Sequence, residues 1–199
     1  MQTRELAISG AFEFTPRTFP DDRGMFVSPY QGDAVFEVVG HRMAVAQTNH
    51  SVSRRGTIRG VHFADVPPSQ AKFVYCPRGA LLDVVVDIRV GSPTFGQWDA
   101  VRLDAVACKA VYVPEGLGHA FIALEDDTAM NYLCSTPYNP PAEHGITPMD
   151  PALDLPWPAD IEPLLSPKDL AAPTLAEALS AGVLPLYSDC LAFYDKLRS

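Results

Sequence analysis

Three side chains of this sequence are candidates for acid–base chemistry. His62 can act as a base, because histidine is the side chain whose unperturbed pKa lies close to neutral pH. Lys72 lies among apolar residues and can stabilise the charge that proton removal leaves, or it can simply occupy the rim of a strand. Tyr132 is by default a core residue with a hydrogen-bonded hydroxyl, and a functional role is the alternative. Together these groups would support acid–base chemistry without oxidation or reduction.

Two of the arginines that stand beside a glycine are of interest, because a glycine lets the backbone approach a bulky anion. They are Arg23, before Gly24, and Arg59, before Gly60. The planar guanidinium suits phosphate because it forms two parallel hydrogen bonds with it. Both arginines are therefore candidates for binding a phosphate group, and a surface salt bridge is the alternative for each.

Two histidine segments have the spacing of cupin metal motifs. Gly56–His62 opens like the first motif, and Pro114–His119 has the spacing of the second. In metal-binding cupins the first motif continues with another histidine and then a glutamate. Here Ala64 occupies the histidine position, and no glutamate follows before Val74. Because two histidines make a poor ligand set for zinc or iron, we predict no metal site and no cofactor.

The candidate residues fall in short segments that are typical of β-strands. Nineteen prolines and 13 glycines interrupt the chain, and the segments between them are rich in Val, Ile, Phe and Tyr. Without helix-length periodic stretches between these segments, the pattern favours an all-β sandwich or barrel over a parallel βαβ fold. The predicted strands are Arg42–Asn49, Thr57–Phe63, Ala71–Cys76, Ala80–Val90, Ala110–Val113, His119–Leu124 and Ala129–Cys134.

Alternation within these strands predicts which side chains share a face. The even-numbered residues of the segment 82–88 are apolar and lie on one face. Gln47 and Asn49 share a face with Val45. Because buried amides need partners, this arrangement predicts a lined cavity, and an exposed face is the alternative.

Helices are expected only late in the chain. Thr174–Glu177 is a capping box, and the helix that it opens should end near Gly182. A second helix should begin after Ser188 and run towards Leu197. The segment 137–173 holds ten prolines together with apolar residues, so we expect a long ordered wrap rather than a linker.

Composition places the chain among globular proteins. Its 199 residues are 47% hydrophobic and 20% charged, which predicts a single domain, 1–199, in which 137–199 forms the proline-rich wrap and the C-terminal helices. The net charge of −9 would repel a polyanion, so neither nucleic acid nor a membrane surface is an expected partner. With no run of 18 apolar residues, no visible signal peptide and four cysteines outside any zinc or redox motif, we expect a cytoplasmic protein with free thiols.

In their order along the chain, these motifs resemble the nucleotide-diphospho-4-keto-6-deoxyhexose 3,5-epimerases, the RmlC-like dTDP-sugar epimerases, and their antibiotic-pathway branch. The resemblance covers about 150 residues. The matching segments are Asp22–Phe26, Gln47–Asn49, Arg59–Phe63, Gln70–Lys72, Gly91–Gly96, Pro114–Phe121, Tyr132, Tyr138, Asp150–Pro151, Trp157–Pro158 and Ser166–Asp169. This resemblance implies a cupin-type jelly-roll barrel with short C-terminal helices, a homodimer, no metal and a dTDP-linked 4-keto-6-deoxyhexose as substrate.

The resemblance also implies roles for individual residues. The catalytic matches are the base His62, its carboxylate partner Asp169, Lys72 near the keto oxygen and the proton donor Tyr132. The substrate-binding matches are Arg23, Arg59 and His119 around the diphosphate, Phe26, Gln47, Asn49 and Tyr138 near the nucleotide or sugar, and Lys168. One position departs from the family, because Ser28 stands where a glutamate usually contacts the nucleotide.

Arg59 and His62 impose a geometric requirement on their strand. They are three residues apart, so a regular strand would place them on opposite faces. If both face the site, the strand must bulge or twist near Gly60, and a glycine permits this.

Several activities remain open at this point. Inversion at C3 and C5, at C3 only and at C5 only all use the same base. A metal-dependent cupin enzyme and a non-catalytic sugar-binding module are alternatives on the same barrel. A jelly roll also leaves sheet edges that must be covered, and one hypothesis is that the segment Leu6–Phe14 adds to a partner's sheet.

Overall fold

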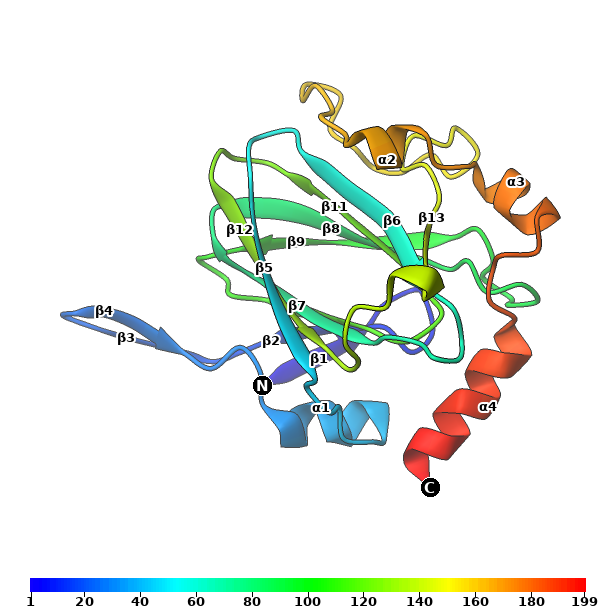
Figure 1. Cartoon of the computed structure of the whole chain (residues 1–199). Helices are drawn as coiled ribbons and strands as arrows, with labels where there is room; N and C mark the ends of the chain where they lie inside the picture. Colours follow the sequence, from blue (N-terminus) through cyan, green and yellow to red (C-terminus); the bar gives the residue numbers. More distant parts are fainter.

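Two antiparallel β-sheets face each other in the computed structural model, which describes all 199 residues (Figure 1). The larger sheet has six strands, in the order β1 (Gln2–Glu5), β2 (Phe12–Thr15), β10 (Ala110–Val113), β7 (Lys72–Arg78), β12 (Thr128–Cys134) and β5 (Gln47–Ser53). The smaller sheet has five, in the order β13 (Glu143–Gly145), β6 (Ile58–Ala64), β11 (Gly118–Ala123), β8 (Ala80–Val86) and β9 (Trp98–Asp104). The predicted all-β class and jelly-roll architecture are confirmed.

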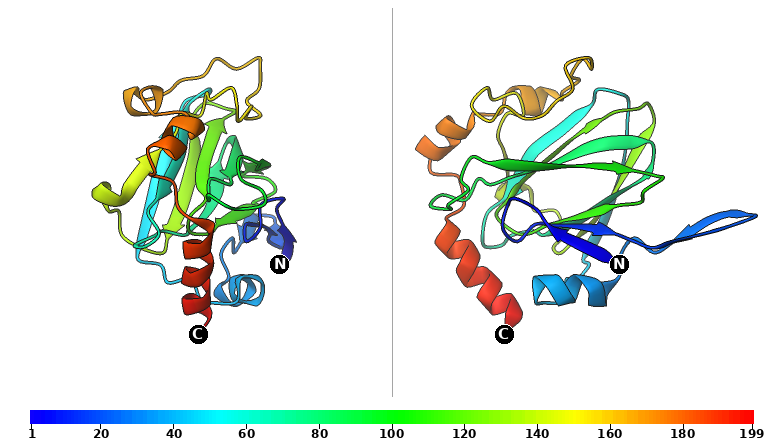
Figure 2. Two further views of the ribbon diagram at one scale, coloured as in Figure 1. Left: turned by 90° about the vertical axis from the view of Figure 1, so that its right-hand side faces the viewer. Right: turned by 180° about the vertical axis from the view of Figure 1, so that it is seen from behind.

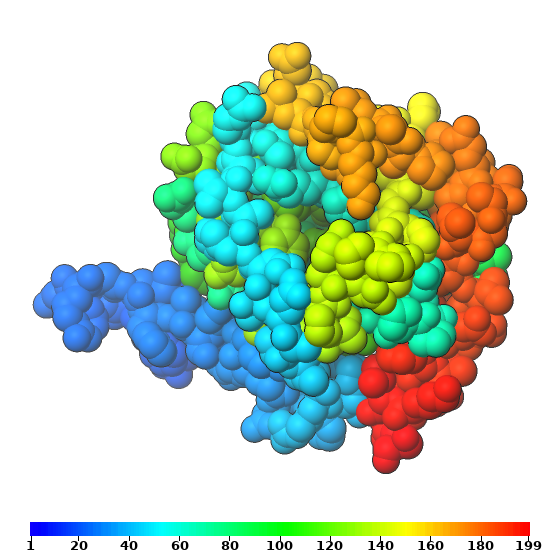
Figure 3. Space-filling model, in the orientation of Figure 1, coloured from blue at the N-terminus to red at the C-terminus, as the bar shows by residue number.

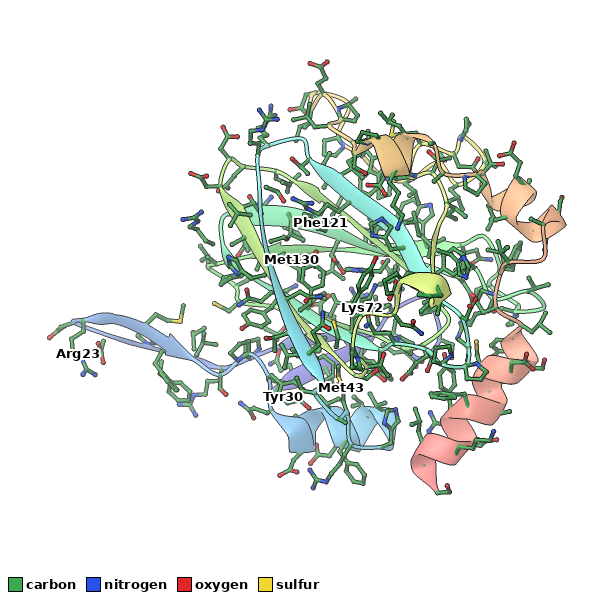
Figure 4. The ribbon with its side chains drawn as sticks, viewed as in Figure 1. Arg23, Tyr30, Met43, Lys72, Phe121 and Met130 are labelled. Carbon is green, nitrogen blue, oxygen red and sulfur yellow. The ribbon has the colours of Figure 1, made fainter.

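The core lies between the two sheets. Val74 and Met130 from the larger sheet pack with Leu81, Val85 and Phe121 from the smaller one, and all five are buried. Figure 4 places Phe121 and Met130 in this interior. Burying one such side chain contributes about 1.5–3 kcal/mol, so this layer holds the sheets together and encloses the cavity described below.

The outer face of the smaller sheet is also covered. Val84 and Val86, on the opposite face of β8 from Val85, pack against Leu153, Leu155 and their neighbours from the segment 146–184. This explains why the even-numbered residues of β8 are apolar: their face is buried under the proline-rich segment and not exposed to water.

The helices are short and lie around the edges of the sandwich (Figure 2). They are α1 (Gly32–Val39), α2 (Pro167–Leu170), α3 (Leu175–Ser180), α4 (Tyr187–Arg198) and the single 3₁₀ turn η1 (Pro140–Ala142). The capping box of α3 is present, since Thr174 and Glu177 bond to each other's backbone N–H groups. The expectation that helices occur only late was wrong. The helix α1 buries Val35 and Val39 and ends at Gly40, whose φ of 85° is the left-handed conformation of a helix C-terminus.

Two strand predictions need correction. The strand expected at Arg42–Asn49 begins only at Gln47 and continues to Ser53, so Val45 precedes it and is exposed. The strand expected at Ala80–Val90 ends at Val86, because the Asp87 side chain bonds to the backbone and guanidinium of Arg89 and turns the chain.

A two-stranded hairpin projects from the body, away from both sheets (Figure 1). It consists of β3 (Thr18–Asp21) and β4 (Gly24–Val27), and its apolar side chains Phe19, Met25 and Phe26 are exposed. An isolated hairpin is marginally stable in water, so these side chains need a surface to cover them.

The N-terminal segment pairs within its own chain. The strand β2 pairs with β10 of the same chain, with Phe12 opposite Tyr112 and Phe14 opposite Ala110. The hypothesis that Leu6–Phe14 adds to a partner's sheet was therefore wrong for this structure, in which that segment completes the chain's own larger sheet.

All four cysteines are buried free thiols, as predicted. None of the helices has the length and apolar character needed to span a bilayer.

Candidate active site

A cavity of about 320 Å³ opens at one end of the sandwich, and Figure 3 shows the recess between β5 and β6 (cyan), the segment 137–145 (yellow-green) and α2 (orange). Eight of the predicted site residues line it: Asn49, Arg59, His62, Lys72, Tyr132, Tyr138, Lys168 and Asp169. Five further residues complete its wall: Gln70, Cys134, Glu143, His144 and Ser166. The structure thus brings together side chains that are up to 120 positions apart in the sequence, from Asn49 to Asp169.

A bulge in β6 brings Arg59 and His62 to the same cavity. Across the strand pair, His62 is opposite His119 and Arg59 is opposite Phe121, so three steps on β6 match two on β11. Gly60 makes this possible with a φ of 127°, and a Cβ atom there would lie 2.5 Å from the Cβ of Ala120. The predicted bulge at this glycine is confirmed.

His62 and Asp169 form a hydrogen-bonded pair. His62 Nε2 donates to Asp169 Oδ1 over 2.7 Å, and Ser166 Oγ donates to the other carboxylate oxygen over 2.8 Å. Burial raises the pKa of Asp169, but the hydrogen bonds from His62 and Ser166 outweigh it and leave the pKa below its ordinary value. The carboxylate is therefore ionised and can only accept, which leaves Nδ1 of His62 as the basic nitrogen.

Lys72 begins β7 and lies opposite Cys134 of β12, inside the sandwich (Figure 4). Burial lowers the pKa of its ammonium group, and the nearby carboxylates of Glu143 and Asp83 partly counter this effect. A desolvated ammonium group is a strong hydrogen-bond donor to an oxygen that develops negative charge.

Tyr132 reaches the cavity from the larger sheet, whereas His62 comes from the smaller one. It lies on β12 between Asn49 of β5 and Val74 of β7 and packs against the core. Burial raises the pKa of its hydroxyl well above the ordinary value, so the phenol is protonated at neutral pH. An acid and a base therefore line one cavity from two facing sheets.

His119 is buried beneath the cavity and does not line it. It is 5% exposed, its Nε2 donates to Asp83 Oδ1 over 2.7 Å, and its ring lies edge-on to that of Tyr132 at 6.3 Å. In this position His119 supports the floor of the site, and the expectation that it lies around the diphosphate stays a prediction. Asp83 was not predicted, although a carboxylate in an otherwise apolar strand was a signal for it.

The amides Gln47 and Asn49 fix the rim. Gln47 Nε2 donates to Asn49 Oδ1 over 2.7 Å, and Gln47 Oε1 accepts from the backbone N–H of Tyr138 over 2.9 Å. Gln47 does not line the cavity itself but holds the two residues that do. Arg59 is oriented by Ser53, whose hydroxyl accepts from Nε over 3.3 Å.

Arg23 and Phe26 lie on the projecting hairpin, far from this chain's cavity (Figure 4). The Arg23 guanidinium pairs only with Asp21, over 2.6 Å, and both side chains are exposed. These two predicted binding residues therefore cannot act on this cavity in the isolated chain.

No cluster of three or more His, Cys, Asp or Glu side chains is arranged to hold a metal ion. The Nε2 atoms of the two cupin-motif histidines are each engaged by an aspartate, His62 by Asp169 and His119 by Asp83. That no metal takes part stays a prediction.

Comparisons with known proteins agree with this geometry. A family model described as dTDP-4-dehydrorhamnose 3,5-epimerase matches residues 5–177. An enzyme of that name from Mycolicibacterium smegmatis is 55% identical over 198 residues, which cover 100% of this chain and 98% of the relative.

Two solved structures are similar over nearly their whole length. The rmlC epimerase of Mycobacterium tuberculosis has a TM-score of 0.97 at 46% identity, with 100% of both chains covered. ChmJ, a 3'-monoepimerase from Streptomyces bikiniensis in complex with dTDP-quinovose, has a TM-score of 0.95 at 48% identity, with 97% of this chain and 98% of ChmJ covered. From the matched length, the identities and the shared fold, this chain belongs to the dTDP-4-dehydrorhamnose 3,5-epimerase family.

Proposed function

We propose that this protein inverts a dTDP-4-keto-6-deoxyhexose at C3, at C5 or at both carbons, by removing and returning a proton without a cofactor. The observation that carries this proposal is the placement of the His62–Asp169 pair and Tyr132 on facing sheets around one cavity that also contains Lys72. The names of the family and of the relatives support the substrate class.

In the first step His62 removes a proton from the carbon next to the ketone. The C–H electron pair becomes the C=C bond of an enolate, and the negative charge moves to the oxygen at C4. Nδ1 of His62 takes the proton, while Asp169 stabilises the imidazolium through Nε2. Lys72 donates a hydrogen bond to the enolate oxygen. A positioned base such as His62 contributes a factor of about 10²–10⁴ to the rate.

In the second step the carbon is protonated from the other side. The Tyr132 hydroxyl donates its proton to the opposite face of the planar enolate, which inverts the carbon and restores the ketone. The phenolate then regains a proton from solvent, and His62 releases the one that it took. No oxidant or reductant is consumed, and the reaction balances with the residues of the cavity and proton exchange with solvent.

The rim of the cavity supplies the charges that a diphosphate needs. Arg59 and Lys168 line it, and Arg59 is already oriented by Ser53. Their attraction for the diphosphate would orient the sugar ring against His62 and so lower the entropy cost of reaction.

The test is proton NMR of a dTDP-4-keto-6-deoxyglucose in D₂O with the purified protein. We expect deuterium to replace hydrogen at C3, C5 or both, with inversion, and His62→Asn to abolish this exchange. His50→Asn is the matched control, since His50 is exposed and does not line the cavity. Failure of the wild-type protein to exchange either hydrogen would refute the proposal and favour a sugar-binding module.

The same spectra separate the alternatives that the sequence left open. Exchange confined to C3 would match ChmJ, a 3'-monoepimerase, and exchange confined to C5 would indicate the other single-site reaction. A stoichiometric metal ion whose removal abolishes turnover would instead indicate a metal-dependent cupin enzyme.

We also propose that the protein acts as a homodimer whose hairpins complete each other's sites. The cavity of about 320 Å³ is at the lower end for ligand pockets, so it suits the sugar and leaves the nucleotide at its mouth. The exposed hairpin carries Arg23 and Phe26, which match binding positions but do not reach their own chain's cavity. Insertion into a second copy would cover the apolar side chains and supply this contact.

Mixing two inactive variants tests this exchange. Arg23→Ala chains keep His62, and His62→Asn chains keep Arg23, so a mixed dimer has one complete site. Random mixing should restore about a quarter of the wild-type activity if the hairpin acts on the partner subunit. No restoration on mixing would show that each hairpin serves its own chain or no site.

We place this reaction in deoxysugar biosynthesis, including antibiotic pathways, and in the cytoplasm. The buried free thiols at all four cysteines support a reducing compartment. Fractionation of cells that produce the protein at its natural level tests the location.

A further inference from the structure

The carboxylate of Asp169 is held by two side chains and not only by its histidine. Oδ1 accepts from Nε2 of His62 over 2.7 Å, and Oδ2 accepts from the hydroxyl of Ser166 over 2.8 Å. The backbone N–H of Asp169 donates back to Ser166 Oγ over 3.1 Å. Serine and aspartate therefore form a closed pair of hydrogen bonds, which fixes both the backbone and the carboxylate of Asp169.

This pair matters because α2 has little else to hold it. The helix is a single turn, Pro167–Leu170, whose residues Lys168 and Leu170 are exposed while only Asp169 is buried. One turn of helix is not stable by itself, and a serine at its N-cap supplies a partner for an otherwise unpaired N–H group. The preceding segment is bound to β6 through the backbone of Leu164, so Ser166 connects this anchor to Asp169.

The hydroxyl of Ser166 has one hydrogen, which it donates in the hydrogen bond to Asp169 Oδ2. With Oδ2 engaged in this way, the carboxylate cannot rotate freely, and Oδ1 is directed at the imidazole. An ionised carboxylate accepts only, so Nε2 of His62 carries a hydrogen and the lone pair lies on Nδ1.

We propose that Ser166 is a positioning residue for the base, because its hydroxyl aligns Asp169 so that His62 keeps the tautomer with Nδ1 free to take the substrate proton. The effect on turnover rests on the proposed function, whereas the effect on the imidazole does not. Ser166 acts through Asp169 and is not itself a catalytic residue.

The chain contains a matched control for the loss of a helix cap. Thr174 caps α3 as Ser166 caps α2: its hydroxyl accepts from the backbone N–H of Glu177 and donates to the Glu177 carboxylate over 2.8 Å. Thr174 does not line the cavity and contacts neither His62 nor Asp169. Thr174→Ala therefore removes the same kind of capping interaction without touching the base.

The first experiment compares the kinetics of Ser166→Ala, Ser166→Thr and Thr174→Ala in the deuterium-exchange assay. We expect Ser166→Ala to lower kcat by about 10-fold to 100-fold with KM within about twofold, because misorientation of a reacting group affects the chemical step. Ser166→Thr, which retains the hydroxyl, should restore kcat, and Thr174→Ala should leave it unchanged. A Ser166→Ala enzyme with the kcat of Thr174→Ala, or with a raised KM and normal kcat, would overturn the proposal.

The second experiment needs no substrate. Nitrogen-15 NMR reports which ring nitrogen of each histidine carries hydrogen, and the chain has only five histidines, so His62→Asn identifies the signal of His62. We expect the Nε2–H tautomer to dominate in the wild type and in Thr174→Ala, and a mixture of tautomers in Ser166→Ala. An unchanged tautomer ratio in Ser166→Ala would refute the positioning role. Because this measurement does not depend on turnover, it also distinguishes that result from failure of the proposed function.

Discussion

Glu115 is a buried carboxyl group whose ionisation should weaken the fold, and Glu115→Gln tests this directly. It lies in the turn between β10 and β11, is 3% exposed, and its Oε2 has no hydrogen-bond partner. Burial raises its pKa from 4.5 to about 7, because the charged form loses its hydration. The hydroxyl of Tyr194, on α4, donates to the backbone carbonyl of the same residue, so this turn also anchors the C-terminal helix.

The direction in which the free energy of unfolding changes with pH follows from proton binding. Between pH 4.5 and pH 7 the folded protein holds this proton while the unfolded chain releases it, so the free energy of unfolding falls as the pH rises. The stabilisation is fully present below the unfolded pKa and lost as the pH rises through the folded one. The difference between the two pKa values corresponds to about 3 kcal/mol at pH 8.

The assay is urea unfolding at fixed protein concentration, at pH 5 and at pH 8. Glu115→Gln removes the titration, so the stability of the variant relative to the wild type should rise by about 2.5 kcal/mol between these pH values. The constant cost of burying the amide, about 1–3 kcal/mol, cancels in this comparison.

Glu177→Gln provides a control of opposite sign. The backbone N–H and hydroxyl of Thr174 lower the pKa of Glu177, so this variant should lose stability at pH 8 and match the wild type in acid. If Glu115→Gln differs from the wild type by the same amount at pH 5 and pH 8, the reasoning about the buried carboxyl is wrong.

Three further outcomes are expected. Tyr132→Phe should reduce inversion by about 10²-fold or more while deuterium exchange at the substrate carbon persists, because the base is intact but the acid is missing; normal inversion, followed by NMR, would remove the role of the phenol. Gly60→Ala should reduce the yield of folded protein and its melting temperature, since the new Cβ would lie 2.5 Å from the Cβ of Ala120, and an unchanged melting curve would argue against the bulge. Asp87→Ala should cost about 3–5 kcal/mol in urea unfolding, because it leaves the buried guanidinium of Arg89 without the carboxylate that lies 2.8 Å away; a loss below about 1 kcal/mol would contradict this.

The local pattern of apolar residues and turn signals was sufficient to predict the central strands. The segment Ala110–Val113 is a strand with the predicted bounds, because four apolar residues between turn signals have no other way to be buried. The helix α1 was missed because it is eight residues long and rich in β-branched valine, which favours strands in local propensity. Its burial against Phe14 and Phe73 decides the outcome, and no local window contains that information.

Site residues could be predicted where the type of side chain implied its chemistry. They could not be predicted where the role of the side chain depends on another residue that it contacts only in the folded structure. The three side chains singled out for proton transfer, His62, Lys72 and Tyr132, line one cavity. The hydrogen bond from Ser166 to Asp169 was not predicted, since a serine near a proline is common and this contact is visible only in three dimensions. For Arg23 the sequence suggested the type of contact but not that the hairpin would carry it away from its own cavity.

The proposed base of this enzyme and its carboxylate partner come from segments far apart in the polypeptide. Asp169 is made 107 residues after His62, and the stretch that delivers it also covers the apolar outer surface of the smaller sheet. Without this stretch the apolar outer face of the smaller sheet would be exposed to water and His62 would lack its carboxylate partner. The proposed alignment of His62 and the protection of this sheet from aggregation therefore depend on the same later segment of the chain.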